Sequence, residues 1–232
     1  GFYDGNFKLT LEPSSADRLS ISGYIGNDAL DLGLPSFRNT GVSRNQLMDW
    51  GNAVGRVSLT HLFGSRLMAT IQASGSRFES NFEVSDAEVS LDDVATQGQG
   101  GGRRLGGGFS LDRNNVLTDL TAKSDFSYFI TQNQTLRFGA QFTRYDGSFR
   151  QGQADSARSE IAAESAYQTG YAELDLEWGR LQLTPGARYS HFDSGDYANL
   201  SPRVMGRFAL SDRIGVKGGW GIYQQYLNLI TV

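Results

Sequence analysis

Apolar and polar residues alternate along most of this chain with a period of two. In residues 213–220, Ile214 and Val216 fall on one side of an extended backbone, while Arg213 and Lys217 fall on the other. A period of two is typical of a β-strand whose faces meet different surroundings. Ten segments follow this pattern: about 2–12, 18–27, 51–61, 66–78, 115–129, 135–147, 165–178, 181–193, 198–210 and 213–225.

The connections between these segments alternate between short and long. Short connections lie near residues 15, 64, 132, 179 and 212, and the longest connection covers about 79–114. Many segments exceed the roughly 5–6 residues usual in soluble sheets and reach the roughly 9–11 residues that a tilted strand needs to cross a bilayer. The pattern therefore predicts an all-β, antiparallel, up-and-down transmembrane β-barrel.

Ionisable residues support this prediction because they gather on one face of the segments. On the apolar faces we find His61, Arg144 and His191, each toward the end of a segment. A charge on a lipid-facing surface costs about 2–4 kcal/mol at the bilayer midplane, so a nearly uncharged face suits a membrane wall. Aromatic residues near segment ends predict interfacial girdles: Phe63, Tyr128, Phe129 and Trp178 beside short turns, and Tyr24, Trp50, Tyr145, Tyr189 and Tyr223 beside long connections.

The composition of the 232 residues is compatible with a barrel. The chain holds 29 glycines, 14 phenylalanines and 10 tyrosines, which favour strands and turns. No apolar run approaches the roughly 18 residues of a transmembrane helix. A mean hydropathy of −0.37 is expected of a barrel, since every second residue faces the lumen. The net charge of −4 argues against nucleic acid as a partner, and the absence of cysteine decides little about the compartment.

The two ends of the chain suggest a part of a larger protein. The first residues contain neither the basic start nor the apolar stretch of a signal peptide. The chain starts inside an alternating segment and stops soon after another. We therefore expect residues 1–232 to form a partial transmembrane β-barrel domain.

Five stretches carry more than alternation: RVSLTHLF (56–63), LRFGAQF (136–142), LTPGARYSHF (183–192), LSPR (200–203) and GWGIYQQYL (219–227). Together, in this order and spacing, they resemble the barrel of TonB-dependent outer-membrane receptors, particularly those of Bacteroidetes-type bacteria. The resemblance covers nearly the whole chain and is strongest from about residue 115 onward.

The resemblance implies a 22-stranded barrel closed around an N-terminal plug domain. Such a receptor lies in the cell outer membrane, contacts its lipid, and takes up a scarce solute such as an iron chelate, cobalamin or a glycan. Energy reaches it from the TonB complex through the plug. This chain departs from the family in having no plug, no TonB box and no aromatic residue at its end, 230–232. We therefore expect about ten strands of the larger barrel, without enzymatic activity or a cofactor.

Two sequence features invite a chemical interpretation. The glycine-rich run at 98–108 lacks the Gly-Lys-Ser/Thr of a P-loop, which favours a flexible surface loop. Glu173, Asp175 and Glu177 share one face, as an acid/base pair or a cation site would require. We favour a row of like charges balanced by arginines on adjacent strands.

Two further features are local. His61 and His191 fall in different segments of a chain without cysteine, so no metal site is expected. Pro185 lies inside a segment and removes a backbone donor, which predicts a bulge or a local bend.

Two groups of residues are the candidates for function. Near the long connections we expect ligand contacts from Trp50, Arg103, Arg104, Tyr145 and Tyr197. On the charged faces we expect residues that line the lumen and meet the plug: Arg137, Glu173, Asp175, Arg188, Arg203 and Arg207.

Two alternatives remain open at this point. A complete ten-stranded outer-membrane barrel with protease-type activity would use His191, Asp193 and Asp196 at its rim. A soluble β-sandwich for binding or adhesion would show the same alternation, with its apolar faces turned inward.

Overall fold

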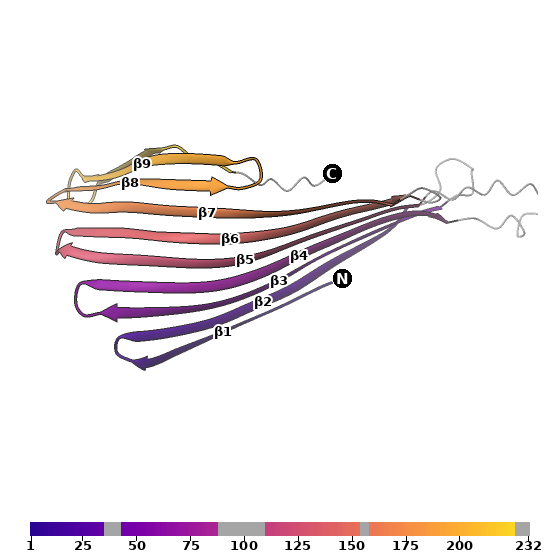
Figure 1. Cartoon of the computed structure of the whole chain (residues 1–232), viewed down its shortest axis with the longest axis horizontal. Helices are drawn as coiled ribbons and strands as arrows, with labels where there is room; N and C mark the ends of the chain where they lie inside the picture. The colour runs from indigo at the N-terminus through magenta and orange to yellow at the C-terminus, as the bar shows by residue number, and fades with distance from the viewer. Residues whose placement is uncertain (35–42, 88–109, 154–157, 226–232) are drawn as a thin grey trace, which may run out of the picture.

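The computed structural model describes residues 1–34, 43–87, 110–153 and 158–225. They form one ten-stranded antiparallel sheet in which neighbouring strands follow one another in sequence (Figure 1), as the predicted fold class requires. Among them, no helix is long and apolar enough to span a membrane. The strands are β1 (Phe2–Ser14), β2 (Asp17–Leu34), β3 (Ser43–Phe63), β4 (Leu67–Ala87), β5 (Ser110–Thr131), β6 (Gln134–Gln153), β7 (Ser159–Trp178), β8 (Leu181–Phe192), β9 (Tyr197–Ala209) and β10 (Gly215–Gly221).

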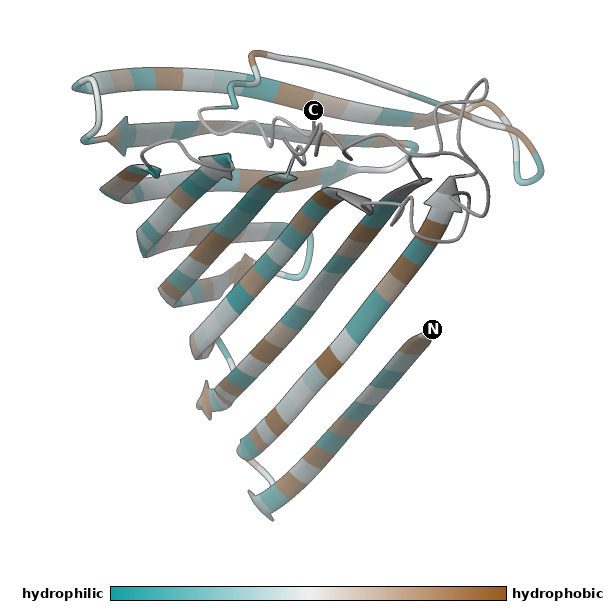
Figure 2. Cartoon of the chain, turned by 90° about the vertical axis from the view of Figure 1, so that its right-hand side faces the viewer, coloured by the Kyte–Doolittle hydropathy of each residue, from teal (hydrophilic) through white to brown (hydrophobic). Residues whose placement is uncertain are grey.

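The sheet is curved and its strands are staggered (Figure 2). One row of paired residues crosses β2 at Ser22, close to the start of that strand, and reaches β8 at Phe192, its last residue. A stagger of about one residue per strand corresponds to a strand tilt of roughly 35°. In the described part of the chain β1 does not pair with β10, so the sheet is an open, barrel-like wall.

All five predicted short turns occur, at one end of the sheet. In the β3–β4 and β7–β8 turns, Gly64 (φ +69°) and Gly179 (φ +56°) adopt the left-handed conformation that glycine tolerates best. In the β1–β2 turn, the Ser14 hydroxyl accepts the Ala16 N–H at 3.1 Å and donates to Asp17 at 2.6 Å. Glycine conformation and side-chain hydrogen bonds within the turns thus determine at which residues these hairpins reverse direction.

Strands β2 to β7 extend further from the short turns than alternation predicted. β4 continues to Ala87 instead of about 78, and β5 begins at Ser110 instead of about 115. Pairing of β3 with β4 is unbroken from Ser43 and Ala87 to Phe63 and Leu67. The long connections are therefore shorter than the sequence suggested. At the other end of the chain, β10 is shorter than the predicted 213–225.

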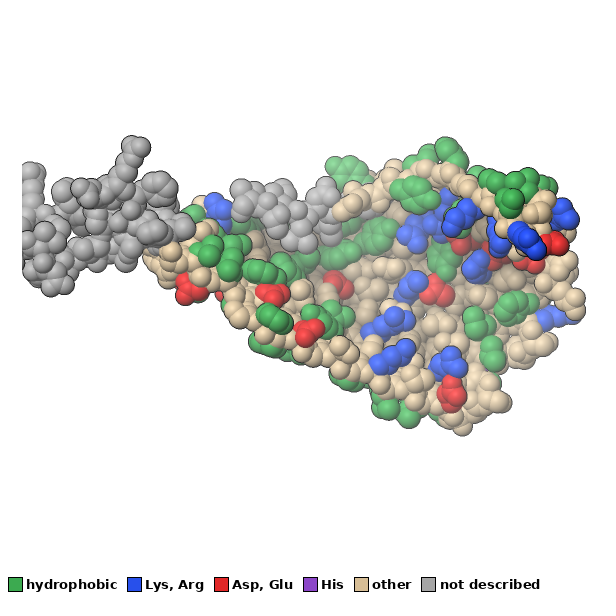
Figure 3. All heavy atoms as spheres, turned by 180° about the vertical axis from the view of Figure 1, so that it is seen from behind, with side chains coloured by type: hydrophobic (Ala, Val, Ile, Leu, Met, Phe, Trp, Pro, Cys, Tyr) green, Lys and Arg blue, Asp and Glu red, His purple; other side chains and the backbone are tan. Residues whose placement is uncertain are grey.

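A reversal of polarity explains why these extensions escaped the sequence pattern. We call the face that carries Arg56 and Thr143 the inner face, and the other the outer face. The inner face is the concave one, because the hollowed side of the sheet is the side rich in lysine and arginine (Figure 3). In the turn-side zone, next to the short turns, the outer face is apolar and the inner face polar. In the loop-side zone the two are exchanged. The loop-side zone comprises residues 27–34, 43–51, 77–87, 110–118, 144–153 and 159–168.

Polar residues cover the outer face of the loop-side zone. Its ion pairs include Arg144–Glu164 at 2.6 Å and Arg150–Glu160 at 3.0 Å. These polar side chains lie on the same face of their strands as the apolar residues of the turn-side zone. The assumption that each strand has one apolar face along its whole length is therefore wrong here. Register places the following on this surface: Asn27, Asp31, Asp49, Arg77, Glu79, Asn81, Glu83, Asp112, Asn114, Arg144, Asp146, Arg150, Glu160 and Glu164.

The outer face of the turn-side zone forms a continuous apolar band. Ile71 (58%), Leu120 (62%) and Leu200 (64%) are among its exposed side chains. No second layer within the described ranges packs against the band, because all ten strands belong to a single sheet. The β-sandwich alternative, which needs two facing sheets, is therefore wrong.

The predicted aromatic girdles are only partly present on the outer face. Phe63, Tyr128, Trp178 and Tyr189 lie on the outer face near the edges of the band. The other girdle candidates in strands lie on the inner face, because strand phase and not closeness to a loop decides which side they take: Tyr24, Trp50, Phe129 and Tyr145.

At Pro185 the β7–β8 ladder is interrupted without a bulge, so the predicted bulge is wrong, while the local bend stays a prediction. The register is the same at Glu173–Gly186 and at Leu176–Leu183, on either side of the gap. A missing donor leaves two pairs unformed but adds no residue to the strand.

Candidate functional site

The inner face of the turn-side zone carries a network of ion pairs. Asp175 on β7 pairs with Arg137 on β6 and accepts a hydrogen bond from Thr184 on β8 at 2.9 Å. Glu177 accepts one from Gln182 at 2.7 Å. In the row of carboxylates predicted on β7, Asp175 is balanced by an arginine on an adjacent strand, as the sequence suggested, whereas Glu177 is hydrogen-bonded to a neutral amide.

One link of this network crosses a strand. The Tyr171 hydroxyl on β7 donates to the Asp125 carboxylate on β5 at 2.6 Å, passing over Gly139 on the intervening β6. A Cβ at Gly139 would lie 2.8 Å from Tyr171 Cε1 and would also collide with the Ser124 carbonyl oxygen. Lys123 pairs with Asp125 at 2.9 Å. Because Gly139 has no side chain, the Tyr171 hydroxyl can reach the Asp125 carboxylate across β6.

A second contact in this network also crosses a strand at a glycine. Arg203 on β9 pairs with Glu173 on β7 across Gly186 of β8. A Cβ at Gly186 would lie 2.7 Å from Glu173 Cγ. The side chains are 24% and 18% exposed, so this is the most enclosed ion pair in the described part of the sheet. Arg188 is placed over the Tyr171 ring, with its guanidinium carbon 5.9 Å from the ring centroid.

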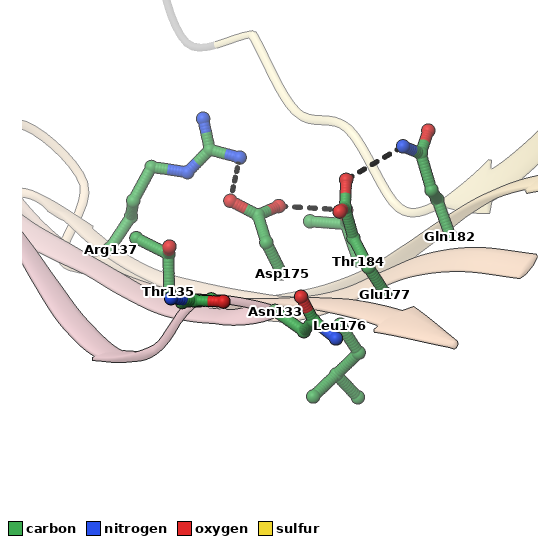
Figure 4. A pocket seen from close by; sticks show the side chains of 9 residues that line it. Asn133, Thr135, Arg137, Asp175, Leu176, Glu177, Gln182 and Thr184 are labelled. Atoms are coloured by element: carbon green, nitrogen blue, oxygen red, sulfur yellow. Dashed lines mark hydrogen bonds and ion pairs between the residues drawn. The ribbon is translucent and has the colours of Figure 1, made fainter. Parts of the chain in front are cut away.

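A polar hollow of about 320 Å³ opens where this network meets the short turns (Figure 4). Arg137, Asp175 and Thr184 form a continuous chain of contacts along it, and Gln182 with Glu177 forms another. Its walls also include Gln132, Asn133 and Thr135. Such a surface offers hydrogen bonds and charges of both signs.

Toward the long connections, the inner face becomes apolar. We define the loop-side apolar surface as Met48, Trp50, Phe78, Phe82, Val84, Leu111, Leu117 and Phe149, which register places together on this face. Figure 3 shows the hollowed face, with lysine and arginine gathered toward the short turns and hydrophobic side chains toward the other end. One inner wall thus presents two different surfaces.

The predicted ligand contacts divide between this surface and its surroundings. Trp50 belongs to it, and Tyr145 and Tyr197 lie on the same inner face. Burial, and next the Asp119 carboxylate, raise the pKa of Tyr145 above its usual 10.0. Arg103 and Arg104 lie outside the described residues. A role in ligand contact stays a prediction for all five.

The six predicted lumen residues lie on one face. Register places Arg137, Glu173, Asp175, Arg188, Arg203 and Arg207 on the inner face. Contact between these residues and a plug domain stays a prediction.

Sequence reasoning did not identify Tyr171 or Arg113 as candidates. Tyr171 has the strand phase of Glu173, which the sequence does show. Its partner Asp125 emerges only once three-strand register places Gly139 between them. Arg113 falls in a segment first assigned to a connection. For that residue the sequence contained no usable signal.

The histidines belong to local structures at opposite ends of strands. His61 Nδ1 lies 2.6 Å from Asp17 Oδ1, and its ring meets Phe63 edge-on. His191 Nε2 lies 3.1 Å from Asp196 Oδ1. Asp193, the third member of the hypothetical protease site, accepts the Ala166 backbone N–H at 2.6 Å. Within the described ranges, no group of three or more His, Asp or Glu residues is arranged to hold a metal.

A tilted, staggered antiparallel wall with an apolar outer band and a polar inner face defines a class, that of membrane β-barrels. A model of the family "TonB dependent receptor-like, beta-barrel" matches residues 2–224, and the chain belongs to this family. This confirms the resemblance found in the sequence. The family consists of receptors and transporters, not enzymes, so the protease alternative is set aside.

Solved structures agree on the fold. A chain of the RagAB peptide transporter superimposes with a TM-score of 0.63 at 12% identity, covering 95% of this chain and 32% of that one. For the ferric yersiniabactin uptake receptor FyuA from Yersinia pestis the values are 0.51, 9%, 95% and 42%. This chain therefore spans about a third to two fifths of the length of those proteins. A search of curated protein sequences found no match.

Proposed function

We propose that residues 1–232 are a partial barrel domain of a receptor in the cell outer membrane that takes up a scarce solute. The observation that carries this proposal is the outer apolar band. On β4 its outer-face residues run from Leu67 to Gly75 and stop at Arg77; on β6 they run from Leu136 to Phe142 and stop at Arg144. The stretch on β4 spans nine residues, within the roughly 9–11 with which tilted strands cross a bilayer, and the stretch on β6 spans seven. Outer-membrane lipid is the proposed partner of the band.

The two zones of the inner face receive separate roles in this proposal. The charged turn-side network and its polar hollow face the plug, through which the TonB complex supplies energy. The loop-side zone projects beyond the bilayer, and there Trp50 and Tyr145 contact the solute. Tyr197, at the start of β9, and Arg103 and Arg104 of the connection also contact it. Family membership supports an iron chelate, cobalamin or a glycan as the class of solute.

Growth experiments test the uptake function of the full-length parent protein. Its gene is deleted in the native bacterium, and growth is compared with iron, cobalamin or a polysaccharide as the limiting nutrient. We expect a defect in one condition that matches the defect of a TonB-deficient strain and is restored by the wild-type gene. Unchanged growth in all three conditions, with the protein absent from the outer-membrane fraction, contradicts the proposal.

Photo-crosslinking tests the plug contact. A photoreactive amino acid at Thr135, on the inner face beside the hollow, should crosslink to the plug of the same full-length chain. The matched control is Leu136, the next residue, which faces outward in the band. Equal crosslinking to the plug from both positions contradicts the assignment of the faces.

A further inference from the structure

Arg113 lies within the loop-side apolar surface. On β5 it shares its face with Leu111, and its directly paired neighbours are Phe82 on β4 and Gln151 on β6. Phe149, two residues from Gln151, belongs to the same face. A guanidinium here stands among aromatic and aliphatic side chains and the neutral amides of Gln151 and Asn115. The arginines of the outer face in this zone, by contrast, stand among carboxylates.

The charge of Arg113 is uncompensated in the described part of the chain. No ion pair or side-chain hydrogen bond joins it to another described residue, and its Nε is buried without a hydrogen-bond partner. Arg188 and Arg203 also have an unpartnered buried Nε. However, Arg203 pairs with Glu173, and Arg188 stacks over Tyr171.

Physical chemistry makes such an arginine unusual. The guanidinium stays charged at any physiological pH, so the half-buried Arg113 cannot relieve the burial of its Nε by losing a proton. Buried polar groups are normally hydrogen-bonded, and an exception calls for an explanation, of which a bound water or ion is one and a functional role another. The flat, forked guanidinium matches a carboxylate or a similar oxyanion with two parallel hydrogen bonds.

We propose that Arg113 and the loop-side apolar surface bind a solute that carries an anionic group on an aromatic or other apolar body. Arg113 pairs with the anionic group, and Phe82 and Phe149 contact the body. Among the described side chains of the inner face, Asp28 on β2 is three strands away from Arg113 and Asp119 is six residues away along β5, so neither is a direct neighbour of its guanidinium. This inference rests on the proposed uptake function and narrows the chemistry of its solute.

The test compares a charged probe with a neutral probe of the same shape. The full-length receptor in detergent is titrated calorimetrically with 2-naphthoate and with 2-naphthamide. We expect wild type to bind the naphthoate about tenfold or more tightly, as a charge-assisted pair implies. In Arg113→Gln the ratio should fall to near one, whereas Arg113→Lys should keep an intermediate preference. Phe82→Ala should weaken both probes alike.

The matched control is Arg150→Gln, which removes an arginine of the same zone that pairs with Glu160 on the outer face. It should leave the naphthoate preference unchanged. Equal binding of the two probes to wild type, or the same loss in Arg150→Gln, overturns the proposal.

The uptake function and the anionic solute can be contradicted independently. If uptake depends on TonB but the receptor shows no preference for the charged probe, the proposal of an anionic solute is wrong and the proposed receptor function is unaffected. A charge preference in a protein whose deletion affects no uptake supports the site and contradicts the proposed function. Folding of each variant is checked by its heat-modifiable migration in electrophoresis, and Arg113→Lys retains the charge if Arg113→Gln fails to fold.

Discussion

The two zones of this sheet share the same strands and the same register, yet they place opposite kinds of residue on their faces. In the turn-side zone the outer face is apolar and the inner face holds ion pairs. In the loop-side zone the outer face holds ion pairs and the inner face is apolar. The backbone is continuous through the boundary, so the surroundings of each zone, and not strand geometry, account for the choice of residues. A face of a strand is therefore apolar or polar over a stretch, not over its whole length.

The largest expected effect comes from charging the outer face in each zone. Ala73→Arg places a guanidinium within the apolar band, and we expect the full-length receptor to lose about 2–4 kcal/mol of folding free energy in bilayers. Ser148→Arg, on the outer face of the loop-side zone, should cost less than about 1 kcal/mol. Reversible denaturant unfolding measures both. Similar losses of folding free energy at the two positions would contradict the assignment of lipid contact to the turn-side zone alone.

Filling a glycine on the inner face should have the next largest effect. Gly139→Ala puts a Cβ where Tyr171 crosses toward Asp125, and we expect a loss of about 1–3 kcal/mol. Gly55→Ala is the control, because a Cβ there meets nothing within 4 Å. It should change stability by less than about 0.5 kcal/mol. A Gly139→Ala variant as stable as wild type would show that the crossing contact contributes little.

The ion pairs of the two zones should differ in strength. A double-mutant cycle on Arg203 and Glu173, the enclosed inner pair, should give a coupling of roughly 1–3 kcal/mol. The same cycle on Arg150 and Glu160, whose side chains are 56% and 53% exposed, should give about 0–1 kcal/mol. Equal couplings would mean that solvent reaches both pairs to the same degree.

The smallest expected effect is a pH dependence at the turn-side edge, outside the apolar band. Hydrogen bonds from Ser14 and then His61 lower the pKa of Asp17 below its usual 3.8. A lowered folded-state pKa contributes stability that is present above about pH 4 and is lost as pH falls through the folded pKa. Asp17→Asn should therefore flatten the acid limb of the stability curve slightly. An identical acid limb in wild type and variant would contradict this contribution.

The sequence predicted the turn-side zone well because one physical rule governs it. Each strand there has one apolar and one polar face, and turn residues such as Gly64 and Gly179 mark its edge. Phe82 and Arg113 escaped because the faces exchange polarity beyond the band, and a strand with exchanged faces resembles a polar loop in sequence. Tyr171 and Asp125 escaped for another reason. Their contact depends on a third strand, and single-strand patterns contain no register.

Gly139 and Gly186 have a consequence for how the wall assembles. Each leaves a gap through which side chains of the two flanking strands meet. If β6 slipped by one residue against its neighbours, Phe138 or Ala140 would occupy the gap and block Tyr171 from Asp125. A slip of β8 would likewise bring Ala187 or Pro185 between Glu173 and Arg203. Backbone hydrogen bonds alone are equally satisfied in every register. The two glycines therefore favour one register of β5 to β9, because only that register leaves room for both contacts between flanking strands.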